Sequence, residues 1–312
     1  MELYKSRDFG AYFQDTFGFI KRHGKHLFKN FFLVTGVFIL VLMVLGYFFM
    51  NFYTEMVFGS IGQSNPNYID NYLDENLGMF LVLFGSFLVL SLVFGLVMYA
   101  FPAIYLKLYA HHNGTSFGAQ DIVDVYKKNI MKLLIFLGAG IVIGIPLVIV
   151  VGLISFLLFI TIIGMLALPV LIGAFSLFYV MTLMEYLEGE RGIWECFGYS
   201  WKLMSSKFWA AVGCVGLFFM MSYLIQNIIT IIAYVFGMVQ FFTSVESGSP
   251  NPEEFTGAMS VVMIITFIGG FLIGAVLNNI VLLNQGIVFY SLKEENENIN
   301  TKSIIDQIGS GD

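Results

Sequence analysis

Histidine is the side chain best suited to metal binding and proton transfer near neutral pH, and this sequence has four of them in two pairs. The pairs are His23 with His26 and His111 with His112. A catalytic metal needs three or four convergent ligands with supporting partners. Two pairs in separate polar segments are more typical of turns and helix ends. The pattern therefore predicts no metal site and no cofactor.

Other catalytic patterns are absent from the sequence. It shows no nucleophile with an adjacent base, no phosphate-binding glycine loop and no basic patch suited to nucleic acid. Four histidines and no predicted strands also exclude an oxygenase that holds iron by four histidines in a β-propeller. We therefore expect a protein without catalytic residues and without a nucleic-acid partner.

Amide side chains are the polar groups that the long apolar stretches do contain. In lipid, hydrogen bonds between side chains of neighbouring helices contribute about 0.6–2 kcal/mol each. We expect such bonds to fasten the last two apolar stretches, with Asn227 facing Asn278, and a polar binding cavity is the alternative. The candidate residues are Gln226, Asn227, Asn278, Asn279, Asn284 and Gln285.

Glycines at small-xxx-small spacing are a second candidate feature, because this spacing lets helix backbones approach closely. Gly140 with Gly144 and Gly270 with Gly274 have the spacing. Pro146 follows the first pair and should kink its helix, since proline removes a backbone hydrogen bond. Helix packing is the favoured role of these residues, and a hinge is the alternative.

The elements that position these residues are predicted membrane spans. The chain is 58% hydrophobic and 12% charged, whereas soluble domains have about 25% charged residues. Crossing a bilayer takes about 20 helical residues, and the uncharged runs are continuously apolar, without the alternation of a lipid-facing strand. The expected fold is an all-α integral membrane protein, with a single membrane domain over residues 1–292. Its six transmembrane helices are predicted at about 31–53, 77–106, 133–157, 164–186, 208–237 and 260–290.

One uncharged run, residues 133–184, is too long for a single span. Its 52 residues would extend for about 78 Å as one helix. It must therefore hold two spans joined by a tight turn, which we place between Leu158 and Gly164.

The positive charges predict the orientation of the spans. All fifteen Lys and Arg residues precede span one, follow span six or lie in the second and fourth gaps, while the charges of the first and fifth gaps are all acidic. Loops retained in the cytoplasm carry Lys and Arg. Both termini, including a short polar tail at 293–312, are expected in the cytoplasm, and the N-terminus lacks a cleavable signal.

Three stretches before spans one, three and five have aromatic and aliphatic residues at helical spacing, followed by a basic segment. This pattern is typical of amphipathic helices in the headgroup region. We expect cytoplasmic interfacial helices at all three places. In the third, Trp194, Trp201 and Trp209 are the predicted interfacial anchors.

The segment Glu190–Met204 carries a resemblance to a known family. With its Ser200, Trp201 and Leu203, and with Trp209 beyond it, the sequence resembles bacterial membrane proteins related to the membrane domain of glycerophosphodiester phosphodiesterase, including the YciC-like proteins. The resemblance implies a six-helix inner-membrane protein. It does not imply phosphodiesterase activity, because no segment here is long enough for a soluble catalytic domain.

The sequence thus favours a non-enzymatic, multi-pass protein of the bacterial inner membrane that acts by association, as a scaffold or assembly partner. Its partners would be the lipid bilayer and other membrane proteins. The alternative is a transporter or lipid-handling protein with a cavity between spans three, five and six. The substrate of such a protein is not specified by the sequence.

Overall fold

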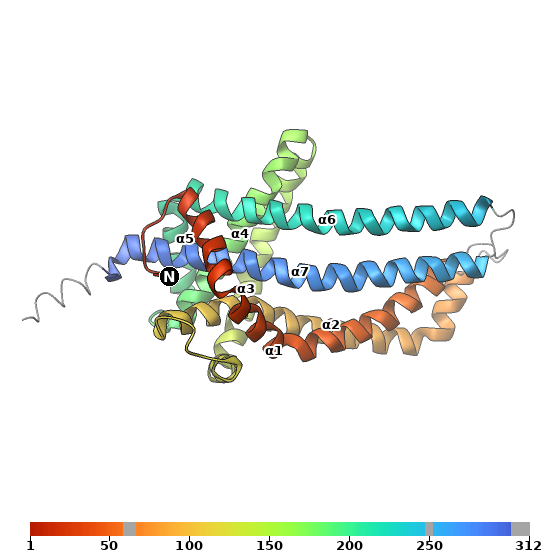
Figure 1. Cartoon of the computed structure of the whole chain (residues 1–312), viewed down its shortest axis with the longest axis horizontal. Coiled ribbons are helices and arrows are strands. Elements are labelled where there is room, and N and C mark those ends of the chain that lie inside the picture. The colour runs from red at the N-terminus through yellow and green to blue at the C-terminus, as the bar shows by residue number, and fades with distance from the viewer. Residues whose placement is uncertain (59–66, 247–251, 301–312) are drawn as a thin grey trace, which may run out of the picture. The chain divides into compact units, whose positions relative to one another are not determined.

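A computed structural model of the chain is almost wholly helical in the residues that it describes, which are 1–58, 67–246 and 252–300 (Figure 1). The predicted polar tail, 293–312, is therefore described only as far as residue 300, and its first residues belong to the last helix. The helices are α1 (Phe9–Phe58), α2 (Tyr68–His111), α3 (Ala119–Phe159), α4 (Ile162–Glu188), α5 (Ile193–Ser206), α6 (Phe208–Glu246) and α7 (Pro252–Glu297).

Six of these helices are long and apolar enough to cross a membrane. They are α1, α2, α3, α4, α6 and α7, and the search for them covered the described residues. The prediction of an all-α membrane protein with six spans is confirmed.

The turn between the third and fourth spans lies inside the segment predicted for it. α3 ends at Phe159, and Thr161 caps the N-terminus of α4 by accepting a hydrogen bond from the Gly164 amide at 2.9 Å. A threonine hydroxyl is a favoured N-cap because it satisfies an amide that has no partner within the helix.

The interfacial segments differ from the prediction at two of three places. The stretches before spans one and three are not separate helices but the first turns of α1 and α3. Neither has a proline where it enters its span, so the helical hydrogen bonds continue without interruption. Only α5 is separate. Gly189, in the left-handed region at φ 88°, ends α4, and Lys207 at φ −136° and ψ 49° ends α5.

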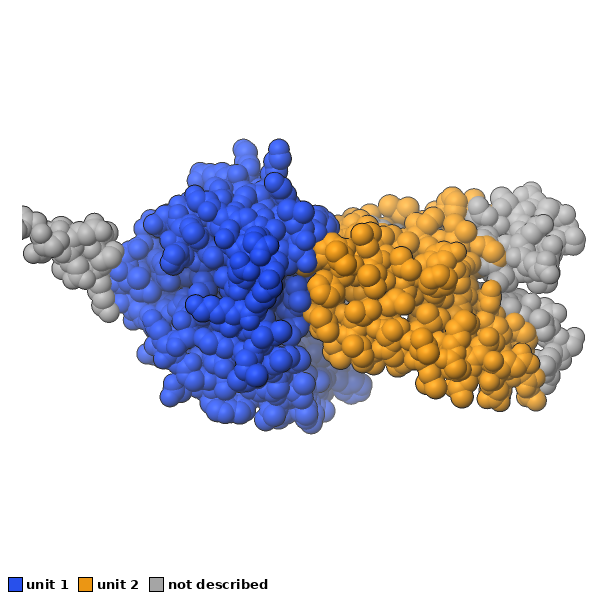
Figure 2. Space-filling view, turned by 90° about the horizontal axis from the view of Figure 1, so that it is seen from below, with its two compact units in different colours: residues 1–34, 96–222, 277–312 blue, residues 35–95, 223–276 orange. Residues whose placement is uncertain are grey.

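The chain divides into two compact units (Figure 2). Unit 1 comprises residues 1–34, 96–222 and 277–312, and unit 2 comprises residues 35–95 and 223–276. Unit 1 contains α3, α4 and α5 whole together with parts of the other four helices. Unit 2 contains only parts of α1, α2, α6 and α7.

Unit 2 is held largely by aromatic side chains. The ring centroids of Phe87 and Phe267 are 6.3 Å apart, which joins α2 to α7. Gly46 of α1 lies against the Phe267 ring so closely that an added Cβ would be 2.0 Å from it. Asn51 accepts a hydrogen bond of 2.9 Å from Ser260.

The C-terminal part of α7 lies at the centre of unit 1. Its residues from Val281 to Leu292 are nearly all buried, with Leu283, Ile287, Val288 and Phe289 fully so. A helix that is apolar on all sides is expected to lie inside a bundle. Polar side chains of α1, α4 and α6 that face this part of α7 are therefore buried inside the bundle as well.

Candidate functional site

Five ionisable side chains meet where α4 and α7 end and α5 begins. We call Glu185, Glu188, Arg191, Lys293 and Glu297 the ion cluster. The side chains of Glu185 and Lys293 are 0% and 2% exposed, and their charged atoms are 2.9 Å apart. Lys293 also donates to Glu188. Because isolated buried charges are very unfavourable, the two charges must be neutralised by each other and by neighbouring side chains of the protein.

Arg191 completes the ion cluster on the side of α5. It donates to Glu185 and, at 3.2 Å, to Glu297, which also accepts a 2.6 Å hydrogen bond from the Tyr199 hydroxyl. The guanidinium lies 4.0 Å from the centre of the Tyr199 ring. Burial opposes the charge of Arg191, but the neighbouring Glu185 and Glu297 outweigh it and raise the pKa of the guanidinium. These contacts fasten α4, α5 and α7 to one another.

Sequence reasoning missed the ion cluster because its members flank the uncharged runs. One signal was available. Glu185 with Glu188 and Lys293 with Glu297 have the i,i+3 and i,i+4 spacing that places charges on one face of a helix. The spacing does not reveal that the two faces meet, since the residues of the central pair are 108 positions apart.

Two of the six predicted amides join helices within unit 1. Asn284 of α7 is fully buried and donates to the Thr16 hydroxyl of α1 at 2.9 Å and to the Cys214 sulfur of α6 at 3.6 Å. Gln285 exchanges hydrogen bonds with Ser176 of α4, at 2.9 Å as donor. These contacts connect α7 to α1, α4 and α6.

The other four amides are placed differently. Gln226 is exposed, Asn278 is half-buried and Asn279 is fully buried. Asn227 donates to the Tyr223 carbonyl of its own helix at 2.8 Å. Asn227 belongs to unit 2 and Asn278 to unit 1, and a hydrogen bond between them stays a prediction.

The histidines take part in helix contacts. His26 of α1 contacts the Tyr105 hydroxyl through Nδ1 and the Phe117 carbonyl through Nε2, both at 2.8 Å. The carbonyl can only accept, so Nε2 is the donor in that contact. His111 and His112 are exposed. Across residues 1–58, 67–246 and 252–300, no three His, Cys, Asp or Glu side chains gather in a group that could hold a metal ion.

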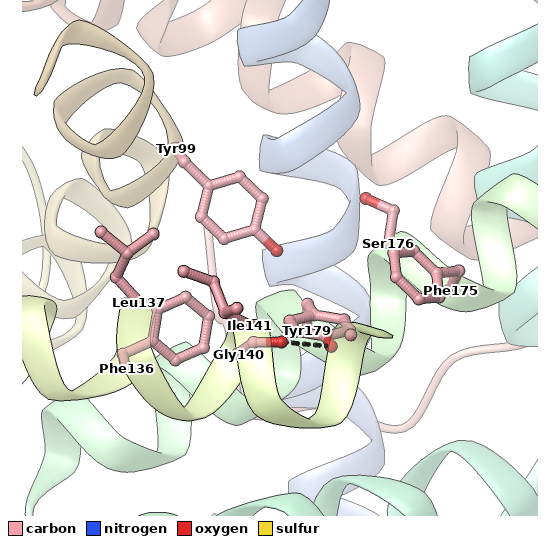
Figure 3. A pocket seen from close by; sticks show the side chains of 9 residues that line it. Tyr99, Phe136, Leu137, Gly140, Ile141, Phe175, Ser176 and Tyr179 are labelled. Atoms are coloured by element: carbon pink, nitrogen blue, oxygen red, sulfur yellow. Dashed lines mark hydrogen bonds between the residues drawn. The ribbon is translucent and has the colours of Figure 1, made fainter. Parts of the chain in front are cut away.

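The glycine pair in α3 makes room for one side chain of α4. Tyr179 donates to the Gly140 carbonyl at 2.9 Å (Figure 3). An added Cβ would be 3.3 Å from the Tyr179 ring at Gly140, and 3.1 Å from its hydroxyl at Gly144. The pair thus admits a tyrosine ring. α3 continues as one helix through Pro146.

The second predicted glycine pair makes no close contact with the described residues. An added Cβ at Gly270 or Gly274 would meet no atom within 4 Å. The close approach occurs elsewhere, between α4 and α6. A Cβ at Gly216 would be 2.8 Å from the Cα of Val170, and one at Gly173 would be 3.0 Å from the Gly216 nitrogen. Gly173 and Gly216 lie on different helices, so no spacing within one segment signals their contact.

The aromatic residues in and next to α5 differ in burial. Trp194 and Trp201 of α5 are 58% and 61% exposed, and Trp209, at the start of α6, is 80% exposed. Phe197 of α5 is buried, with its ring centroid 5.6 Å from that of Phe178 in α4. α5 thus packs one face on the protein and leaves Trp194 and Trp201 exposed on the other.

We expect the three tryptophans to contact the headgroup region, because an indole ring combines an apolar body with a hydrogen-bond donor. Their fluorescence in vesicles should be blue-shifted and quenched most by lipids brominated near the headgroup. Variants that keep one tryptophan and replace the other two by phenylalanine assign the signal. Strong quenching of all three by aqueous iodide would place α5 and the start of α6 in water instead.

Cys196 lies on the buried face of α5. Burial first, and then the charge of Glu185, raise the pKa of its thiol to about 11. The thiolate is the nucleophilic form of cysteine. Cys196 is therefore protonated at neutral pH and is unsuited to nucleophilic catalysis.

A cavity of about 340 Å³ lies among α2, α3 and α4 (Figure 3). Its lining is almost wholly carbon. This is not the location predicted for a cavity, which was between spans three, five and six. The lining residues are Tyr99, Phe136, Leu137, Gly140, Ile141, Gly144, Phe175, Ser176 and Tyr179.

The six long apolar helices define the class of protein, which is a multi-pass, α-helical membrane protein. No family model, curated protein or solved structure matches the chain.

Proposed function

We propose that this chain is a non-enzymatic protein of the bacterial inner membrane that acts by association, as a scaffold or assembly partner of other membrane proteins. The observation that supports the proposal is how the buried polar groups are used. Glu185 binds Arg191 and Lys293, and Asn284 and Gln285 bind hydroxyls of other helices. These groups fasten the bundle instead of facing a polar cavity.

A transport protein uses its buried polar groups differently. Ionisable residues on an ion or proton pathway face the bundle interior or a water-filled cavity. Here the most buried ions form pairs with one another, and the cavity among α2, α3 and α4 is lined almost wholly by carbon. A lipid-handling role remains the alternative, and that apolar cavity is the observation in its favour.

The association role predicts a complex of defined size. The solubilised protein, at its native expression level, should migrate on native gels in one band well above its own 35.1 kDa and its detergent. The band should contain a constant ratio of this chain to a second membrane protein. In proteoliposomes the purified chain should pass neither protons nor potassium. Migration as a monomer, or measurable flux, would contradict the proposal.

The orientation is part of the same proposal. The distribution of Lys and Arg supports a cytoplasmic position for the positive loops and both termini. Single cysteines at Asn67 and Ser116, which are both exposed, test it in a background with Cys196 and Cys214 replaced by alanine. In intact cells an impermeant thiol reagent should label Asn67→Cys and leave Ser116→Cys unlabelled until the cells are opened. The reverse pattern would invert the topology.

A further inference from the structure

The cavity among α2, α3 and α4 lies at a definite depth relative to the basic ends of these helices. Each of the three helices takes part in a lysine contact. Tyr99 lies eight residues from Lys107 of α2, Gly140 lies eight residues from Lys132 of α3, and Tyr179 lies eight residues from Leu187 of α4. These contacts are made by Lys107, which donates to the Leu187 carbonyl, and by Lys132, which donates to the Tyr186 carbonyl at 3.2 Å.

Eight residues of α-helix extend for about 12 Å. The cavity is therefore about two turns deeper than the lysines, on helices long and apolar enough to cross a membrane. Lysine ammonium groups stay at the headgroup level. The cavity consequently lies in the hydrocarbon layer, below the level at which phospholipids hold their ester and phosphate oxygens.

One polar group inside the cavity has no use within the protein. The Tyr99 hydroxyl is buried, and it has no hydrogen-bond partner among the described residues. The other two hydroxyls of the lining are engaged, since Tyr179 donates to Gly140 and Ser176 bonds to Gln285. Buried hydroxyls in proteins are nearly always satisfied, so Tyr99 is positioned to donate to a group that enters from outside the chain.

The walls suit a flat ring. Four of the lining side chains are aromatic, and the rings of Tyr99 and Phe136 are nearly parallel, with centroids 6.2 Å apart. Figure 3 shows the Tyr99 ring extending from α2 toward the α3 and α4 residues. Ile141, at 55% exposed, forms an open rim. The volume of about 340 Å³ is in the lower part of the range of about 300–1,000 Å³ for small-molecule sites.

We propose that this cavity binds a quinone from the bilayer, with a ring carbonyl accepting the hydrogen bond of Tyr99. A quinone combines the three required features. It has a carbonyl oxygen that enters the hydrocarbon layer, a flat ring for the aromatic walls, and an apolar tail that leaves over the rim at Ile141. The proposal concerns binding alone and involves no redox step. It is independent of the association role proposed above.

The test uses the full chain in detergent with decylubiquinone as the probe. The quinone should raise the unfolding temperature in a saturable way, since it binds the folded state. Tyr99→Phe should weaken the apparent affinity about 2- to 12-fold through loss of one hydrogen bond. Ile141→Trp should abolish the shift by filling the rim.

The chain offers matched controls. Tyr223→Phe and Ile145→Trp change residues that are 65% and 61% exposed and do not line the cavity, so both should respond like the parent protein. An equal shift in all variants would mean that the quinone only partitions into the micelle, and no shift would mean that it does not bind. Either result overturns the proposal. Displacement of the quinone by phosphatidylglycerol with the same dependence on Tyr99 would also overturn it, in favour of a phospholipid.

Discussion

Replacement of Lys293 by methionine should lower the free energy of unfolding by about 3–5 kcal/mol, because it leaves buried carboxylates without their cation. Lys293 is 2% exposed and binds both Glu185 and Glu188. Methionine keeps most of the side-chain volume, so the loss measures charge rather than packing. The measurement is reversible unfolding in mixed micelles, followed by circular dichroism.

An exposed lysine, Lys127, provides the control for the buried Lys293. Lys127 pairs with Asp124 at 3.7 Å, but these side chains are 70% and 59% exposed. Lys127→Met should therefore cost only about 0–1 kcal/mol. A second variant, Lys293→Met with Glu188→Gln, removes one cation and one carboxylate and leaves Glu185 bound to Arg191. It should recover part of the loss. Equal costs at Lys293 and Lys127 would show that the ion cluster is hydrated and not buried.

The parts of the structure that sequence predicts are those fixed by local composition. Whether a run crosses a membrane depends on its length and on the absence of charge, and both can be read without knowing any contact. The turn at Thr161 could also be located, because 52 uncharged residues require a reversal near their middle. The continuous entry of α1 and α3 into their spans was not predicted, since an amphipathic pattern does not say whether a helix stops.

The site depends instead on which helices meet. Asn284 was a candidate from its type alone, but its partner Thr16 is 268 residues away and nothing in the local pattern indicates the contact. The same holds for Tyr99, whose hydroxyl matters because α3 and α4 enclose it without supplying an acceptor. The spacing rule for glycines identified Gly140 and Gly144 but equally Gly270 and Gly274, because spacing does not include the partner helix.

The contact of α4 with α6 gives the second large effect. Gly216→Ala should destabilise the protein by about 1–3 kcal/mol, the usual cost of overpacking a close contact. The added Cβ would be 2.8 Å from the Cα of Val170. Backbone atoms cannot rotate away as a side chain can, so the helices must separate. This cost outweighs the gain of about 1 kcal/mol that alanine brings over glycine within a helix.

Gly270→Ala is the matched variant, because the same methyl group there meets no described atom within 4 Å. It should be neutral or slightly stabilising by helix propensity alone. Val170→Ala combined with Gly216→Ala separates backbone from side-chain crowding. Since the nearest atom is the Val170 Cα, the second substitution should restore little stability. Full restoration would mean that the valine side chain, and not the helix backbone, sets the distance between α4 and α6. A loss at Gly270 as large as that at Gly216 would mean that α7 makes a close contact at Gly270 in the membrane.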